Sequence, residues 1–271
     1  MKPEYLKLAE KVAGLFAQLP QVEAVALGGS RGSAAIANDA ASDVDIYVYT
    51  HADISPEERQ SIVKGTGGAS QSNLGLNYWG PGDEWYNAPT GIEVDIVYFD
   101  TKWIENQIDR VIHRAQPSMG YTTCNWFTLR QSVILSDSHG WLTALQERSN
   151  VGYPEELRRA IIAFNHPVLR EIIPAYAHQI EKAAMRGDRV SVNHRLAALF
   201  ASYFDVLFAF NRVLHPGEKR LLDFARSNCA RLPESMETDI NEVLRASCVD
   251  LPSITGHVNR LLDRLDQLLK D

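Results

Sequence analysis

The stretch Ser42-Asp43-Val44-Asp45-Ile46-Tyr47-Val48-Tyr49 decides how the first half of this 271-residue chain is interpreted. Its β-branched and aromatic residues predict a strand, because such side chains are favoured in sheets. Positions i and i+2 of a strand point to the same side, so Asp43 and Asp45 would present both carboxylates on one face, about 6–7 Å apart. Two acids placed in this way repel each other unless a cation lies between them, and Mg²⁺ prefers hard oxygen ligands. Two solvated acids on an edge strand are the alternative.

A second strand is predicted at residues 22–27, and it ends in Gly28-Gly29-Ser30. Glycines at such a turn let the backbone approach a ligand closely. A helix that starts there offers N–H groups to phosphate oxygens. A simple turn is the alternative interpretation of the same residues.

A third strand is predicted at residues 92–99, and it carries Asp95 within an apolar run. An acid in that setting is costly to bury without a partner. If this strand lies beside the strand of Asp43 and Asp45, Asp95 completes a cluster of three carboxylates. Such a cluster could hold one or two metal ions, or Asp95 could act as a general base. A salt-bridged strand acid is the alternative, and Glu93 lies on the same face.

The remaining elements of the first half follow from helix and turn signals. Ser55-Pro56-Glu57-Glu58 is typical of a helix start, with a capping serine, proline at the first position and acids in the first turn. The other expectations are helices at 3–18 and 101–115, a loop at 65–91 with a short strand around 85–87, and a short strand at 133–135.

The pattern changes near residue 150, after which only helical periodicity follows. We therefore expect an α+β protein with two domains, a mixed sheet with flanking helices at 1–150 and an all-α helical bundle at 151–271. The expected helical segments of the second domain are 154–186, 189–214, 217–228, 234–246 and 252–270.

Composition excludes several classes of protein. Hydrophobic residues make up 45% and charged residues 23% of the chain, which is typical of a globular protein. No apolar run approaches the roughly 20 residues of a membrane span, the N-terminal segment does not resemble a secretory signal, and the three cysteines fit a reducing cytoplasm. Residues 1–150 carry 11 Lys and Arg against 18 Asp and Glu, which disfavours a nucleic-acid surface.

The order of these features resembles the nucleotidyltransferase superfamily of the DNA polymerase β type. That family combines a Gly-Gly or Gly-Ser turn, an acid-x-acid pair and a third strand acid, and the resemblance covers residues 22–100. The twelve residues between Ser30 and Asp43 form a longer and more Ala-rich segment than the family pattern. With a helical second domain, the layout is similar to the antibiotic nucleotidyltransferases that adenylylate aminoglycosides or lincosamides.

The resemblance implies a role for each matched residue. Gly29 and Ser30 would contact the phosphates of ATP or another nucleoside triphosphate, and Asp43 and Asp45 would bind Mg²⁺, with two ions expected. Asp95 would be the third metal ligand or the base that deprotonates the acceptor hydroxyl. Basic side chains are expected near the triphosphate. The candidates are Arg31, Arg195 and Lys219, although helix-end charges that complement the helix dipole are the alternative.

The expected activity is transfer of a nucleoside monophosphate, AMP from ATP, to a hydroxyl of a small acceptor, with release of pyrophosphate. An aminoglycoside or lincosamide acceptor would make the protein an antibiotic-resistance enzyme, acting as a monomer or homodimer. Two alternatives stay open, a macromolecular acceptor such as tRNA or a protein hydroxyl, and a catalytically silent nucleotide-binding module.

Several further side chains are candidates for acceptor recognition. Asp83 and Glu84 could attract a cationic acceptor, and Asp205, in an apolar helical run, could serve the acceptor or pair with an arginine. Aromatic residues before the third strand could stack on a base or pack against the acceptor, although a packed hairpin tip explains them equally well: Tyr78, Trp79, Trp85 and Tyr86.

Overall fold

A computed structural model describes residues 2–29, 43–78 and 80–270 of the chain. The chain forms two compact units, and each is described by itself. The first unit comprises Met1–Asp109 and Thr128–Val151, and the second comprises Arg110–Phe127 and Gly152–Asp271. The sequence placed one boundary near residue 150, whereas the segment Arg110–Phe127 groups with the second unit.

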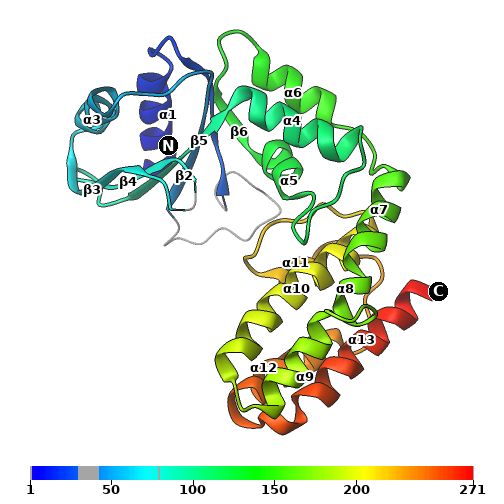
Figure 1. Cartoon of the computed structure of the whole chain (residues 1–271). Coiled ribbons are helices and arrows are strands. Elements are labelled where there is room, and N and C mark those ends of the chain that lie inside the picture. The colour runs from blue at the N-terminus through cyan, green and yellow to red at the C-terminus, as the bar shows by residue number, and fades with distance from the viewer. Residues whose placement is uncertain (1, 30–42, 79, 271) are drawn as a thin grey trace. The chain divides into compact units, whose positions relative to one another are not determined.

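The first unit contains a six-stranded mixed sheet with the strand order β3-β4-β5-β2-β1-β6 (Figure 1). The central strands β2 and β5 are parallel, and the other neighbouring strands are antiparallel. The expected α+β class is therefore confirmed. The strands are β1 (Val22–Leu27), β2 (Val44–Thr50), β3 (Ala69–Leu76), β4 (Gly82–Asn87), β5 (Glu93–Asp100) and β6 (Val133–Ser136).

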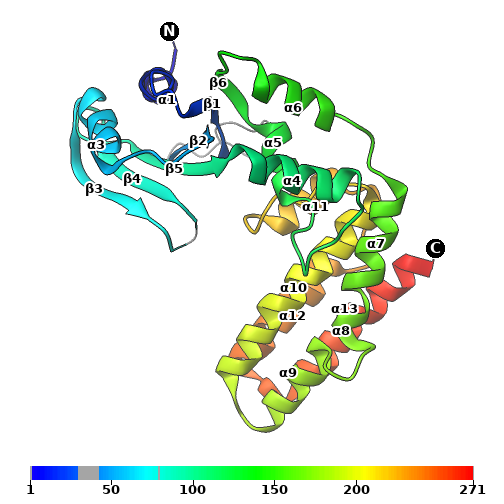
Figure 2. The same ribbon diagram turned by 45° about the horizontal axis from the view of Figure 1, so that its top comes forward.

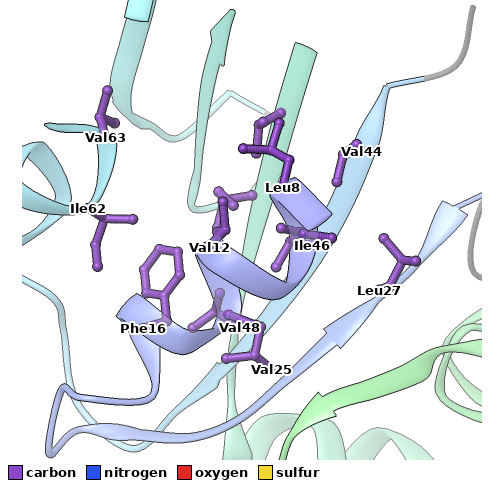
Figure 3. Packing of buried hydrophobic residues seen from close by; sticks show 14 of the residues in the cluster. Leu8, Val12, Phe16, Val25, Leu27, Val44, Ile46, Val48, Ile62 and Val63 are labelled. Carbon is purple, nitrogen blue, oxygen red and sulfur yellow. The ribbon is translucent and has the colours of Figure 1, made fainter. Parts of the chain in front are cut away.

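One face of the sheet packs against α1 (Glu4–Phe16) and α3 (Pro56–Gly65). Figure 3 shows side chains of α1, such as Leu8, Val12 and Phe16, lying against side chains of the central strands. Helix α3 begins as its sequence predicts, because the Ser55 hydroxyl accepts from the Glu58 N–H and the Glu58 carboxylate accepts from the Ser55 N–H. The even-numbered side chains of β2 point into this core. The odd-numbered side chains therefore point to the opposite face of the sheet.

The opposite face carries a row of aromatic side chains from β2 and β5. Phe99 lies between Tyr47 and Tyr49, with 5.6 Å between ring centroids in each pair. Trp103 of α4 (Thr101–Ile112) stacks on Phe99, and Trp141 of α6 (Trp141–Ser149) packs on Tyr49. Alternation along the strands places Asp43, Asp45 and Asp95 on this same face, at the end where the two strands begin.

Residues 65–91 differ from the expectation of a loop with one short strand. They form the hairpin of β3 and β4 at the edge of the sheet (Figure 2). Strand β3 was missed because its sequence, ASQSNLGL, lacks apolar alternation, and its side chains are mostly exposed. Helix α6 and helix α5 (Cys124–Gln131) were also not predicted.

The second unit is a set of helices around α10 (Arg189–Asn211), whose residues Ser202 to Ala209 are all buried. A helix that is apolar on all sides belongs in the interior of such a bundle. The expected segment 154–186 is divided into three helices, with Pro167 and Pro174 at the interruptions. The other helices are α7 (Glu155–Asn165), α8 (Pro167–Arg170), α9 (Tyr176–Met185), α11 (Leu221–Asn228), α12 (Met236–Val249), η1 (Leu251–Ser253) and α13 (Ile254–Lys270).

Two expected boundaries were too wide. The helices expected at 189–214 and 217–228 end at Asn211 and begin at Leu221, and an irregular connection lies between them. Among the described residues, no helix combines the length and apolar character needed to cross a membrane.

Candidate metal centre

Three carboxylates meet where β2 and β5 begin. The parallel register sets Asp45 directly beside Asp95, and Asp43 immediately precedes β2. One carboxylate oxygen from each of the three side chains lies within 4.8 Å of the other two, and all three side chains are half-buried. The pairing of the two strands, which the sequence left as a condition, is therefore present.

Two further acids surround this cluster. Glu84 of β4 lies opposite Asp95 in the antiparallel register, and Glu93 precedes Asp95 by two residues on the same face. Burial raises the pKa of Asp95 to about 6, and the negative charges of Asp45, Glu84, Asp43 and Glu93 add to this effect. Glu93 also raises the pKa of the Tyr86 hydroxyl, with which it is hydrogen-bonded. The sequence did not predict that Glu84 faces the cluster, because this depends on the register of β4 against β5.

The glycine turn after β1 packs directly against the cluster. The N–H of Gly28 donates to the Asp45 carbonyl oxygen at 2.9 Å, and the N–H of Gly29 donates to the Tyr47 hydroxyl at 3.3 Å. Gly29 has a φ of +58°, and a Cβ atom there would lie 1.7 Å from Oδ2 of Asp45. Glycine is thus required both by the backbone conformation and by the carboxylate beside it. Ser30 and Arg31, the other predicted phosphate contacts of this turn, lie outside the described residues.

The donor set fits a hard divalent cation. All three groups are carboxylates, the ligands that Mg²⁺ takes together with substrate phosphates. Their close approach costs free energy through mutual repulsion, and a bound cation removes that cost. Within residues 2–29, 43–78 and 80–270, this is the group of His, Cys, Asp and Glu side chains whose spacing suits a metal ion.

Asp83 is buried, whereas the sequence suggested that it could attract a cationic acceptor. Its side chain is 2% exposed and lies on the opposite face of β4 from Glu84. It accepts hydrogen bonds from the Arg59 guanidinium at 3.3 Å, the Gly75 N–H at 2.7 Å and the Tyr98 hydroxyl at 2.5 Å. Asp83 therefore ties α3 and β3 to the sheet.

The aromatic candidates also divide into a buried residue and exposed residues. Trp85 is buried in the core beneath α1 and α3, whereas Tyr78 and Tyr86 are exposed. Trp79 lies outside the described residues. Only the two tyrosines among the described candidates thus keep surface available for a ligand.

The candidates of the helical unit have different surroundings. Arg195 is exposed in the first half of α10, and Lys219 is exposed in the connection that follows this helix. Asp205 is buried, and its carboxylate accepts from the Thr122 N–H at 3.0 Å, the Thr122 hydroxyl at 2.6 Å and the Asn165 amide at 3.1 Å. Asp205 thus has a structural role that differs from both expected ones.

The chain resembles a family model over part of its length and several solved structures. The model of a domain of unknown function (DUF4037) matches residues 121–221, which is less than half of the chain. No curated protein matches. Of the solved structures, 19 chains match, and they include the crystal structure of a nucleotidyltransferase-like protein from Exiguobacterium sibiricum 255-15. That similarity has a TM-score of 0.45 at 11% identity and covers 97% of this chain and 74% of the other.

Proposed function

We propose that this protein is a Mg²⁺-dependent nucleotidyltransferase that transfers a nucleoside monophosphate, AMP from ATP, to a hydroxyl group and releases pyrophosphate. The observation that carries the proposal is the cluster of Asp43, Asp45 and Asp95, whose carboxylate oxygens lie within 4.8 Å of one another. The glycine turn that packs on Asp45 adds to it, because the missing Cβ of Gly29 leaves room for the Asp45 carboxylate beside the other two.

Each of the three acids has a proposed role. Asp43 and Asp45 would hold Mg²⁺, and when bound the ion neutralises charge on the triphosphate and orients its α-phosphorus. Asp95 is the third ligand or the proton acceptor for the attacking hydroxyl. A carboxyl with a pKa of about 6 is mostly ionised at neutral pH and close enough to it to exchange a proton readily.

We also propose that basic side chains contact the phosphates of the nucleoside triphosphate. Arg195 and Lys219 are the candidates among the described residues, and Arg31 is the candidate beside the glycine turn. Asn211 follows Arg195 by sixteen positions along α10, which is about 24 Å at 1.5 Å per residue. Lys219 follows that far end, so we propose that one of the two, and not both, contacts the phosphates.

The acceptor is proposed to be a small hydroxylated molecule of the aminoglycoside or lincosamide kind. Glu84 and Glu93 favour an acceptor with positive charge, because they place two more carboxylates beside the three that would bind metal. Their side chains are half-buried and share the face of the sheet with Asp95. A macromolecular acceptor stays the second candidate for the same site.

The test is titration calorimetry of ATP with and without Mg²⁺. We compare the wild type with the double variant Asp43→Asn/Asp45→Asn and with Asp53→Asn, which neutralises an exposed acid of the same unit. We expect Mg²⁺-dependent binding in the wild type and in Asp53→Asn, and its loss in the double variant, while the circular dichroism spectrum stays unchanged.

Pyrophosphate release in the presence of hydroxylated antibiotics then tests the acceptor. Release that requires both Mg²⁺ and an antibiotic supports the full proposal. Equal ATP binding by the double variant and the wild type would contradict the metal site. Binding of ATP without any turnover, across antibiotics, tRNA and protein acceptors, would favour the silent nucleotide-binding module.

A further inference from the structure

An open pocket of about 390 Å³ lies within the helical unit, apart from every residue assigned above. Its volume falls in the range of small-molecule sites. It is formed where the start of α7, the end of α10, the segment after α11 and the end of α13 come together. Its lining residues are Arg158, Phe210, Asn211, Arg212, Ala230, Arg231 and Leu269.

The pocket has an excess of positive charge. Arg158, Arg159 and Arg212 all pair with one carboxylate, that of Glu155, at 2.9 Å, 3.3 Å and 2.8 Å. Three guanidinium groups therefore share one carboxylate, and three arginines, Arg158, Arg212 and Arg231, line the pocket. Arg158 and Arg212 line the pocket, and each guanidinium has five N–H donors, of which Glu155 takes only a part.

The basic side chains are held in place by neighbouring groups. The Asn211 amide donates to the Arg231 carbonyl oxygen and accepts from the Arg231 N–H, both at 2.9 Å. The Arg231 guanidinium lies 5.2 Å from the centroid of the Phe210 ring, a cation–π arrangement. Preorganised guanidinium groups lose less side-chain entropy when a ligand binds.

Arg212 adopts a backbone conformation that normally selects glycine. It ends α10 with a φ of 55°, in the left-handed region. Glycine is the usual residue at such a helix end, so an arginine there retains its side chain at a conformational cost. The interaction of its charge with the helix dipole explains part of this choice. The ion pair with Glu155, which directs the guanidinium to the pocket, is a second reason.

We propose that this pocket binds the phosphate group of a small phosphate monoester, or inorganic phosphate itself. A phosphate dianion offers more charge and more acceptor oxygens to the three lining arginines than a monocarboxylate does. Arginine is also the side chain that recognises phosphate with two parallel N–H···O bonds. The proposal is independent of the metal centre, because its residues all belong to the helical unit.

The test is calorimetric titration of the full-length protein with inorganic phosphate, with the ionic strength held constant by chloride. We expect one saturable site with a dissociation constant below about 1 mM. Arg212→Gly suits the φ of this position, so it removes the guanidinium without threatening the helix end. We expect it to weaken phosphate binding roughly tenfold or more, and Arg231→Ala to do the same.

The matched control is Arg245→Ala, which removes an exposed arginine from α12 outside the pocket and should leave the affinity unchanged. Ribose 5-phosphate should compete with phosphate, and acetate at equal concentration should not. Asp43→Asn/Asp45→Asn should still bind phosphate, which separates this site from the proposed nucleotide site. The proposal fails if no saturable binding is seen, if Arg212→Gly and Arg231→Ala bind like the wild type, or if Arg245→Ala weakens binding equally.

Discussion

Asp45 and Asp95 stand side by side on neighbouring parallel strands, and further carboxylates lie close enough to act on Asp95. Asp43, Glu84 and Glu93 all raise the pKa of Asp95. Natural proteins seldom accept such a concentration of like charge without a function, because it opposes folding. The arrangement therefore lowers stability in a way that a bound cation would reverse.

The first prediction concerns the pH dependence of stability without metal. The pKa of Asp95 is about 6 in the folded protein and about 3.8 when unfolded. The folded state thus binds the proton more tightly, and its stability falls as pH rises from about 4 through 6. Two pKa units correspond to about 3 kcal/mol, which solvent screening of this half-exposed group reduces to about 1 kcal/mol.

Asp95→Asn should therefore be about 1 kcal/mol more stable than the wild type at pH 8 in EDTA, with little difference at pH 4. Urea unfolding at both pH values measures this. Asp53→Asn serves as the control because it alters an exposed acid of the same unit. A variant that is equally stable or less stable than the wild type at pH 8 would show that Asp95 is not destabilised by its neighbours.

The second prediction concerns the glycine turn. Gly29→Ala places a Cβ atom 1.7 Å from Oδ2 of Asp45, so the carboxylate must move. We expect metal affinity, measured by calorimetry with Mn²⁺ or Mg²⁺, to fall at least about tenfold, and stability to fall by about 1–2 kcal/mol through the positive φ. The matched control is Gly91→Ala, which has a similar φ of +70° but open space around its Cβ position. Equal loss of metal affinity in both variants would show that the clash with Asp45 is irrelevant.

Much of the sheet could be predicted from local sequence. The strands at 22–27, 44–49 and 92–99 were recognisable because buried central strands are rich in β-branched and aromatic residues. The cap at Ser55 was recognisable because its chemistry lies within four consecutive residues. By contrast, β3 is an exposed edge strand held by its backbone pairing with β4, and its polar sequence contains no sign of that pairing.

The candidate site shows the same limit. The face shared by Asp43 and Asp45 follows from strand alternation alone. The position of Glu84 beside Asp95 depends on the register of β4, and the burial of Asp83 depends on Arg59, which lies 24 residues earlier in α3. Two neighbouring acids thus have opposite roles, and their identity as acids could not distinguish them.

The third prediction tests the structural role of Asp83. Asp83→Asn removes the charge that pairs with Arg59 and turns an amide N–H₂ toward groups that already donate. Loss of one partner from a buried pair costs about 3–5 kcal/mol, so we expect stability to fall by about that amount in urea unfolding. Metal affinity of the folded variant should stay unchanged. Loss of acceptor binding at full stability would restore Asp83 as a recognition residue.

The fourth prediction concerns Asp205, which follows Tyr203 by two residues in the buried part of α10. Asp205 accepts three hydrogen bonds from Thr122 and Asn165, whereas the buried Tyr203 hydroxyl has no hydrogen-bond partner within the described part of the chain. Asp205→Ala removes the acceptor of these three hydrogen bonds and should cost about 3 kcal/mol near pH 5, at about 1 kcal/mol for each bond. Tyr203→Phe, the matched control, should be neutral or slightly stabilising.

The stability loss of the Asp205 variant should depend on pH, whereas that of the Tyr203 variant should not. Burial raises the pKa of Asp205 to about 7, so its contribution to stability is complete below about pH 4 and is lost as pH rises through 7. The loss caused by Asp205→Ala should therefore be smaller at pH 8 than at pH 5, whereas the effect of Tyr203→Phe should be the same at both. Urea unfolding of the full chain, followed by circular dichroism, measures the difference. If Asp205→Ala is as stable as Tyr203→Phe at pH 5, the hydrogen bonds to Asp205 do not support the helical unit, and its carboxylate becomes free for a role in ligand binding.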